Sequence, residues 1–204
     1  MKFKIWFNNL KNEEKSDVSI LRRVLAYLFD WYIGGVFVSI PIFIMYQLFV
    51  KKDIVLSNTL FILPKEQAFI AGIISIFLAF FYYTVIPYHF WNGQTLGKKI
   101  AKIRIVNIDY SPLSFKTLFM RQMIFMLLIE GRVLMPSLFI HELVSLIVGY
   151  NLVFIFSYIG YTITILSVCF ALQLESRRSL HDVLSGTKVM MDSKLLKKKC
   201  TKKL

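Results

Sequence analysis

Asp30 is the residue with the strongest potential for chemistry, because its carboxylate lies inside an apolar stretch of the chain. The stretch runs from Leu25 to Val50 and is long enough to cross a bilayer. A lone carboxylate in hydrocarbon is costly, so such residues are usually paired with a cation or line a polar cavity. We expect Asp30 to be either half of a structural ion pair or a titrating, cation-binding group in a transport path.

Arg23 precedes Asp30 by seven residues and would share one face of a helix with it. At a rise of about 1.5 Å per residue the two lie about 10 Å apart along the helix axis, which is too far for direct pairing. The partner of Asp30 must therefore come from another segment. Arg121 and Arg132, beside a later apolar segment, are the candidates.

A second polar segment carries glycines, a hydroxyl and a lysine: Gly93, Thr95, Gly97 and Lys98. It is not a nucleotide-binding P-loop, because only three residues separate the glycines and no Ser or Thr follows the first lysine. We expect a tight turn where the chain leaves the membrane. Its lysines, Lys98 and Lys99, would extend to lipid phosphates or simply to the membrane surface.

A third polar segment holds His181, Asp182, Gly186 and Thr187. Adjacent residues do not face one another on a helix, and no serine lies in a nucleophile elbow, so the His-Asp pair does not predict a hydrolase. The spacing of Ser179 and Asp182 indicates a short helix start. Residues 188–191 predict a strand that pairs with residues 103–106, which would bring Asp182 close to the glycine-lysine loop.

The composition indicates a membrane protein, because 204 residues that are 56% hydrophobic, with a mean hydropathy of +0.60, exceed what a soluble core can bury. The formal net charge of +13 is read first as a signal of topology. Cys169 lies in an apolar run and Cys200 in a lysine-rich tail, which excludes a disulfide-stapled domain. We predict no catalytic residues, no metal site and no cofactor.

The fold class we predict is all-α, a polytopic transmembrane helical bundle of about four spans with a small cytoplasmic loop that contains the two-stranded pairing. The expected spans are Leu25 to Val50, Ala68 to Phe90, Gln122 to Ile140 and Leu143 to Leu174. Aromatic residues near the end of the second span resemble an interfacial belt: Phe80, Phe81, Tyr82, Tyr83, Tyr88 and Trp91. Residues 1–20 form a cytoplasmic tail, 21–191 the membrane domain and 192–204 a basic cytoplasmic tail.

Basic residues set the sidedness, since cytoplasmic segments are rich in Lys and Arg. The leading tail, the central loop and the trailing segment hold six, six and nine of them. Four crossings of the cell membrane place all three basic segments, and with them both termini, on the cytoplasmic side. Three crossings would place the trailing segment outside the cell. A second allocation keeps this sidedness: Leu113 to Ile129 lies along the inner surface, and Val133 to Gly149 and Tyr150 to Leu174 form a hairpin. It avoids placing Glu130 and Arg132 in mid-membrane.

The three polar segments, in this order, resemble the RDD family of bacterial membrane proteins. The resemblance covers residues 20–191 and places the arginine and two aspartates that name the family at Arg23, Asp30 and Asp182. It implies an α-helical inner-membrane protein with a cytoplasmic loop and tail. It also implies a role in transport of monovalent cations, protons or another small solute.

Two functions remain open: a small transporter or transporter subunit in which Asp30 exchanges a cation or proton, and a non-transporting accessory, immunity or assembly factor. An enzyme is not expected, because the three histidines show no metal or catalytic spacing. The partners we expect are anionic lipids, and a second copy or a membrane protein, but no nucleic acid. Self-association would use close-approach points at Gly34, Gly35, Gly149 and Gly160.

Overall fold

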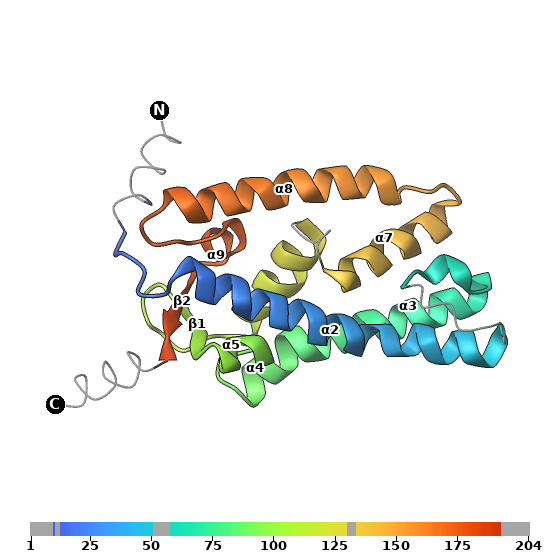
Figure 1. Ribbon diagram of the computed structural model, residues 1–204, viewed down its shortest axis with the longest axis horizontal. Coiled ribbons are helices and arrows are strands. Elements are labelled where there is room, and N and C mark those ends of the chain that lie inside the picture. The colour runs from blue at the N-terminus through green and yellow to red at the C-terminus, as the bar shows by residue number, and fades with distance from the viewer. Residues whose placement is uncertain (1–9, 11–12, 51–57, 130–133, 193–204) are drawn as a thin grey trace.

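The computed structural model describes residues 10, 13–50, 58–129 and 134–192. Three long apolar helical segments run along its length: α2 (Ile20–Phe49), the continuous run of α3 (Lys65–Phe80), η2 (Phe81–Val85) and α4 (Ile86–His89), and α8 (Val153–Gln173) (Figure 1). Each is long and apolar enough to cross a membrane. The prediction of a transmembrane helical bundle is confirmed.

The apolar sequence between the second and last long helices divides into shorter helices: α6 (Phe115–Phe119), η3 (Met120–Ile129) and α7 (Met135–Val148). The turn from α7 to α8 lies at the opposite end of the molecule from the sheet (Figure 1). The broken segment from α6 to α7 therefore runs the length of the bundle. With the three long helices it accounts for about four spans.

The boundaries first expected in this region, Gln122 to Ile140 and Leu143 to Leu174, are wrong. Helix α7 continues through residues 140–143, and the chain turns at Gly149, whose φ is +80°. Glycine adopts this left-handed conformation freely and commonly ends a helix, but no charge marks the turn in the sequence. The second allocation agrees with the bounds of α7 and with the turn at Gly149, but it placed Leu113 to Ile129 along the inner surface, whereas Met123, Met126 and Leu127 of η3 belong to the core of the bundle. Glu130 and Arg132 lie outside the described residues.

A small cap closes one end of the bundle. It is built from α5 (Leu96–Ile100), β1 (Ile103–Asn107), the short helix α9 (Leu180–Leu184) and β2 (Thr187–Met191). The strands pair antiparallel, and residues 103–106 lie opposite 188–191, the two segments predicted to pair. The pairing extends one residue further, to Asn107 opposite Thr187. The described parts of both chain ends meet here, since Asp17 accepts a hydrogen bond from the Met191 amide at 3.3 Å. This arrangement agrees with about four spans. The basic C-terminal tail lies outside the described residues.

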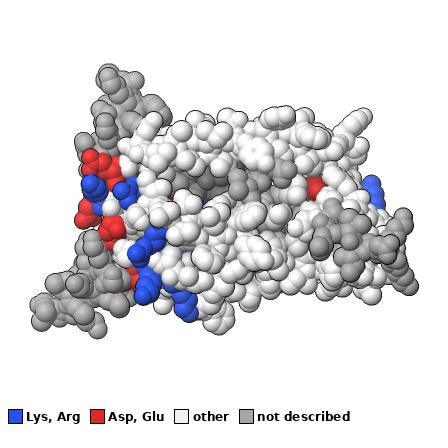
Figure 2. Space-filling model, viewed as in Figure 1, with Lys and Arg blue, Asp and Glu red and all other residues white. Residues whose placement is uncertain are grey.

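Charged side chains gather at the capped end, whereas the long faces of the visible side carry almost none (Figure 2). The lateral faces of the long helices expose large apolar groups, such as Phe43 on α2 and Phe154 on α8, at 50% and 68%. This distribution suits a bundle whose sides contact acyl chains. The chain is therefore a membrane protein with one charged, capped end.

The aromatic belt expected at the end of the second span is wrong for its two central tyrosines. Tyr82 and Tyr83 are buried, and the hydroxyl groups of both donate to Asp30 or its backbone carbonyl, at 3.1 and 3.0 Å. Gly34 makes room for this contact, because a Cβ there would lie 2.3 Å from the Tyr83 hydroxyl oxygen. Gly35 faces Met135 of the same chain. These two glycines thus allow close packing within the chain.

Candidate polar site at the capped end

Asp30 lies on the inner side of α2, with 1% of its surface exposed, and both of its carboxylate oxygens are occupied. One oxygen accepts from the Gly97 amide at 2.8 Å and from the Tyr82 hydroxyl at 3.1 Å. The other accepts from the Thr95 hydroxyl and from the Lys98 ammonium group, which lies 3.2 Å away. A buried carboxylate is tolerated when it is paired and hydrogen-bonded in this way.

Lys98, not Arg121, is the counter-ion of Asp30, so the partner expected from the sequence is wrong. The reason lies in the close approach of α5 to α2 at Gly97. A Cβ at Gly97 would lie 2.2 Å from the Ala26 carbonyl oxygen, and only glycine permits this contact. The approach turns Lys98 inward. The expectation that Lys98 extends to lipid phosphates is also wrong, whereas Lys99 stays exposed, with its ammonium group over the Trp91 ring.

The glycine-lysine loop is thus a cradle for Asp30. Gly93 turns the chain with a φ of +85°, Thr95 begins α5, and Gly97 and Lys98 follow directly. Three residues that the sequence singled out, Thr95, Gly97 and Lys98, contact Asp30, which lies at least 65 positions earlier in the chain. The contribution of Tyr82 could not be predicted, because a tyrosine near the end of a span is also typical of the membrane interface.

Asp182 is the second buried carboxylate, at 1% exposure, and two arginines hold it. One of its oxygens accepts from Arg121 at 2.6 and 3.1 Å, and the Arg23 guanidinium lies 3.5 Å from the other. Asp182 and Ser179 also form a capping box at the start of α9, as their spacing predicted. Arg121, which was expected beside Asp30, is therefore committed to Asp182.

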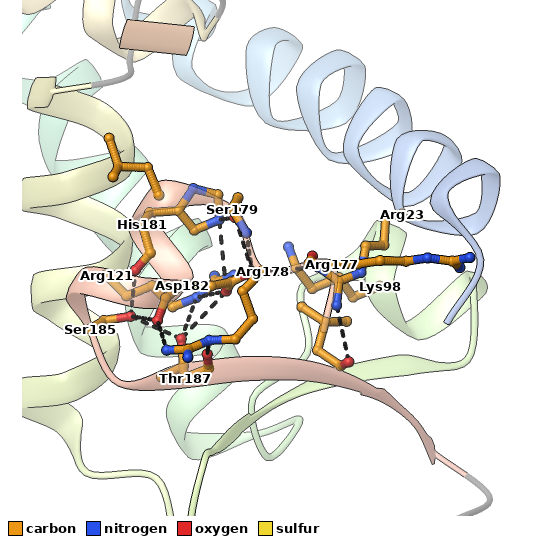
Figure 3. A network of polar contacts seen from close by, with 12 residues as sticks. Arg23, Lys98, Arg121, Arg177, Arg178, Ser179, His181, Asp182, Ser185 and Thr187 are labelled. Carbon is orange, nitrogen blue, oxygen red and sulfur yellow. Dashed lines mark hydrogen bonds and ion pairs between the residues drawn. The ribbon is translucent and has the colours of Figure 1, made fainter. Parts of the chain in front are cut away.

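His181 lies closer to Asp182 than adjacency on a helix led us to expect. Its Nε2 is 2.9 Å from the Ser179 hydroxyl and 3.9 Å from an Asp182 oxygen, because the ring folds back over the first turn of α9 (Figure 3). Thr187 joins the same cluster, since its hydroxyl accepts from Arg121 at 3.2 Å. Gly186, with a φ of +66°, makes the turn from α9 into β2.

Arg178 also belongs to this network, although it was not predicted as a site residue. Its side chain is 2% exposed and donates to the backbone carbonyls of Thr187 and Asp182 at 3.0 and 3.1 Å, and to Glu13 at 2.5 Å (Figure 3). Arg178 thereby fixes the turn that carries Asp182. Its place in the Arg177-Arg178 pair could be interpreted only as one of the basic residues that indicate the cytoplasmic side.

The electrostatics of the two carboxylates and their partners differ. Burial alone would raise the pKa of Asp182, but the charges of Arg121, His181 and Arg23 outweigh it and hold that pKa well below its usual range. Burial lowers the pKa of Lys98, and the nearby charge of Asp30 opposes this only in part. Asp182 therefore stays ionised, whereas Lys98 gives up its proton more readily than a surface lysine.

A cavity of about 290 Å³ lies between α2, η3, α8 and α9 and is lined by Asp182 and by Lys98, the partner of Asp30. Its ionisable lining residues are Arg23, Lys98, Arg121, Arg177, His181 and Asp182. The remaining wall is mostly apolar and comes chiefly from α2 and α8. Among the residues that the structure describes, no cluster of His, Cys, Asp and Glu suits a metal ion.

At the opposite end, Glu142 is a buried acid that the sequence analysis did not select. It is 3% exposed on α7 and accepts from the Thr59 hydroxyl at 2.5 Å and the Leu60 amide at 2.7 Å. It thus caps the short helix η1 (Leu60–Ile62) and ties it to α7. This role could not be predicted from the sequence, because η1 lies 82 positions before Glu142 in the chain.

Comparison with known proteins identifies the family of the chain. The model of the RDD family matches residues 18–186. The chain is also 28% identical, over 167 residues, to "Uncharacterized protein YckC" of Bacillus subtilis (strain 168), covering 82% of this chain and 80% of that protein. No solved structure matches. The matched region contains Arg23, Asp30, Arg121 and Asp182, and the chain belongs to the RDD family.

Proposed function

We propose that this protein is a small transporter, or a subunit of one, in which the Asp30–Lys98 pair exchanges a proton or a monovalent cation. The observation that carries the proposal is the position of the pair. Asp30 is buried within a membrane-spanning helix, and its counter-ion Lys98 lines the cavity at the capped end. Ionisable groups within membrane-spanning segments commonly mark ion and proton pathways.

The exchange would work through competition for Asp30. The lowered pKa of Lys98 favours release of its proton into the cavity, and a proton or cation would then take its place as the neutralising charge on Asp30. The hydroxyls of Tyr82 and Thr95 and the Gly97 amide hold the carboxylate in place during this change. The site needs no cofactor and no covalent step, and we propose no enzymatic activity.

Flux in proteoliposomes tests this proposal. With a pH-sensitive dye inside the vesicles and an imposed gradient of a monovalent cation, we expect Asp30→Asn and Lys98→Gln to reduce coupled flux at least tenfold. Lys99→Gln is the matched control, because it removes a neighbouring lysine charge that is exposed. It should transport as the wild type does. Undiminished flux through correctly inserted Asp30→Asn would exclude the proposed exchange.

A second candidate is a non-transporting accessory, immunity or assembly factor. The observation in its favour is that Asp30 is held by four donors, an arrangement that also suits a purely structural tie between α2 and α5. Co-purification of a stoichiometric membrane partner, together with the absence of flux for all monovalent cations tried, would support this candidate over transport.

We further propose that the protein lies in the cell membrane with the capped end in the cytoplasm, where its basic residues would meet anionic lipids. Single cysteines in a cysteine-free background check this. We expect Asn58→Cys and Asn151→Cys, both exposed at the far end, to react with an impermeant maleimide in intact cells. Asp109→Cys, exposed after β1, should react only after permeabilisation. The reverse pattern would invert the orientation.

A further inference from the structure

The cavity at the capped end carries more positive charge than its acids neutralise. Asp30 is paired with Lys98, and Asp182 accepts its shortest contacts from Arg121. Arg23 lies further from Asp182, at 3.5 Å, and Arg177 forms no ion pair with a described carboxylate. Two guanidinium charges thus remain in excess around a partly buried space, which favours binding of an anion beside them.

Two buried guanidinium nitrogens at this cavity have no acceptor among the described residues. Arg121 is 2% exposed, and its Nη1 is buried without a hydrogen-bond partner. The Nε of Arg23 is likewise buried and unpaired, whereas its two Nη atoms donate to the backbone carbonyls of Arg177 and Val189. Arg177 donates from Nη1 to the Val18 carbonyl at 2.7 Å. Buried donors without acceptors are rare in folded proteins and point to an absent ligand or water. An anion with several oxygens would satisfy these donors.

The remaining lining of the cavity is apolar and opens toward the side of the bundle, between α2 and α8. Val24 on α2 is 45% exposed, and Val168 and Leu172 on α8 are 53% and 60% exposed, although all three line the cavity. These residues lie on the halves of α2 and α8 nearest the charged cap, where the membrane surface would be (Figure 1). The cavity therefore joins an arginine-rich inner part to a lateral apolar opening.

We propose that this cavity binds one anionic phospholipid. The phosphate of the lipid lies among Arg23, Arg121 and Arg177. One of its acyl chains leaves the cavity along Val24, Val168 and Leu172. Guanidinium groups bind phosphate through two parallel hydrogen bonds, which suits a site built from three arginines. A free phosphate ion shares the head-group chemistry but leaves the apolar opening unfilled. The binding site does not depend on the exchange proposed at Asp30.

Lipid binding to the detergent-solubilised full chain, measured by native mass spectrometry, tests the head-group contact. Dioleoyl phosphatidylglycerol should bind at least tenfold more tightly than dioleoyl phosphatidylcholine. Arg177→Gln should remove about tenfold of that affinity, since hydrogen bonds to a charged group are each worth about 1.5–3 kcal/mol and tenfold corresponds to about 1.4 kcal/mol. Arg22→Gln is the control, because Arg22 also donates to one backbone carbonyl, at 3.4 Å, but does not line the cavity.

A second variant tests the lateral opening and separates lipid from free phosphate. Val168→Trp fills the opening from a surface position, so it should weaken phosphatidylglycerol binding and leave any thermal stabilisation by inorganic phosphate unchanged. Equal loss in Arg177→Gln and Arg22→Gln, or equal affinity for the two lipids, would overturn the site. Unchanged lipid binding in Val168→Trp, with displacement by inorganic phosphate, would assign it to free phosphate. If Arg177→Gln fails to fold, Val168→Trp decides.

Discussion

Asp182→Asn is expected to lower the free energy of unfolding by about 3–5 kcal/mol, the typical cost of removing one partner from a buried ion pair. Arg121, 2% exposed, would then keep its charge without a counter-ion, and Arg23 would lose its nearest acid. The asparagine amide would also present donor hydrogens toward guanidinium donors. Unfolding by SDS in mixed micelles, followed by tryptophan fluorescence, measures the loss.

Asp192→Asn is the matched control for this substitution. Asp192 pairs with Arg104 at 2.5 Å, but the two side chains are 33% and 21% exposed. Water and salt screen such a pair, so its removal should cost about 0–1 kcal/mol. If both substitutions lower the free energy of unfolding equally, burial is not the reason that the Asp182 ion pairs stabilise the protein.

The lowered pKa of Asp182 predicts how the stability of the protein responds to acid. The pKa of this carboxyl group in the folded protein lies below its usual value of 3.8, so the unfolded chain binds the proton more tightly. The stabilisation by Asp182 is therefore fully present above about pH 4 and is lost only as the pH falls below that value toward the folded pKa. Between pH 7 and pH 5 this group should contribute no change in stability.

The sequence was sufficient to predict that Asp30 needs a cationic partner, because the cost of a carboxylate in hydrocarbon does not depend on the fold. It was not sufficient to identify Lys98, which follows 68 positions later. That pairing depends on how closely α5 approaches α2, and the approach is set by one missing Cβ at Gly97. Spacing along one helix excluded Arg23 as the direct partner but carried no information on α5.

The strand pairing was predictable because alternation of apolar residues survives in a short segment, and β1 and β2 pair over the residues expected. The turn at Gly149 was predicted only by the second of two allocations, because a membrane protein can turn between two apolar helices without a charged residue. Arg121 was placed correctly at the capped end but beside the wrong acid. Two buried acids and several arginines compete there, and their pairing is decided by packing.

Gly97→Ala is expected to destabilise the protein by about 3 kcal/mol and to expose Lys98. The new Cβ would lie 2.2 Å from the Ala26 carbonyl oxygen and 2.9 Å from the Asp30 carboxyl group, and the backbone of α2 cannot yield as a flexible side chain does. Overpacking of this kind typically costs about 1–3 kcal/mol. The displacement of α5 would also lengthen the Gly97 amide and Lys98 contacts with Asp30, which adds the cost of a weakened buried pair.

Gly35→Ala separates this effect from the general preference of helices for alanine. Its Cβ would meet only the flexible side chain of Met135, at 3.3 Å, so the gain of up to about 1 kcal/mol in helix propensity should offset a small adjustment. Unfolding in mixed micelles and amine labelling of Lys98 measure the two variants together. A Gly97→Ala protein as stable as the wild type, with Lys98 still protected from labelling, would show that α5 does not approach α2 closely enough to hold Asp30 through its backbone.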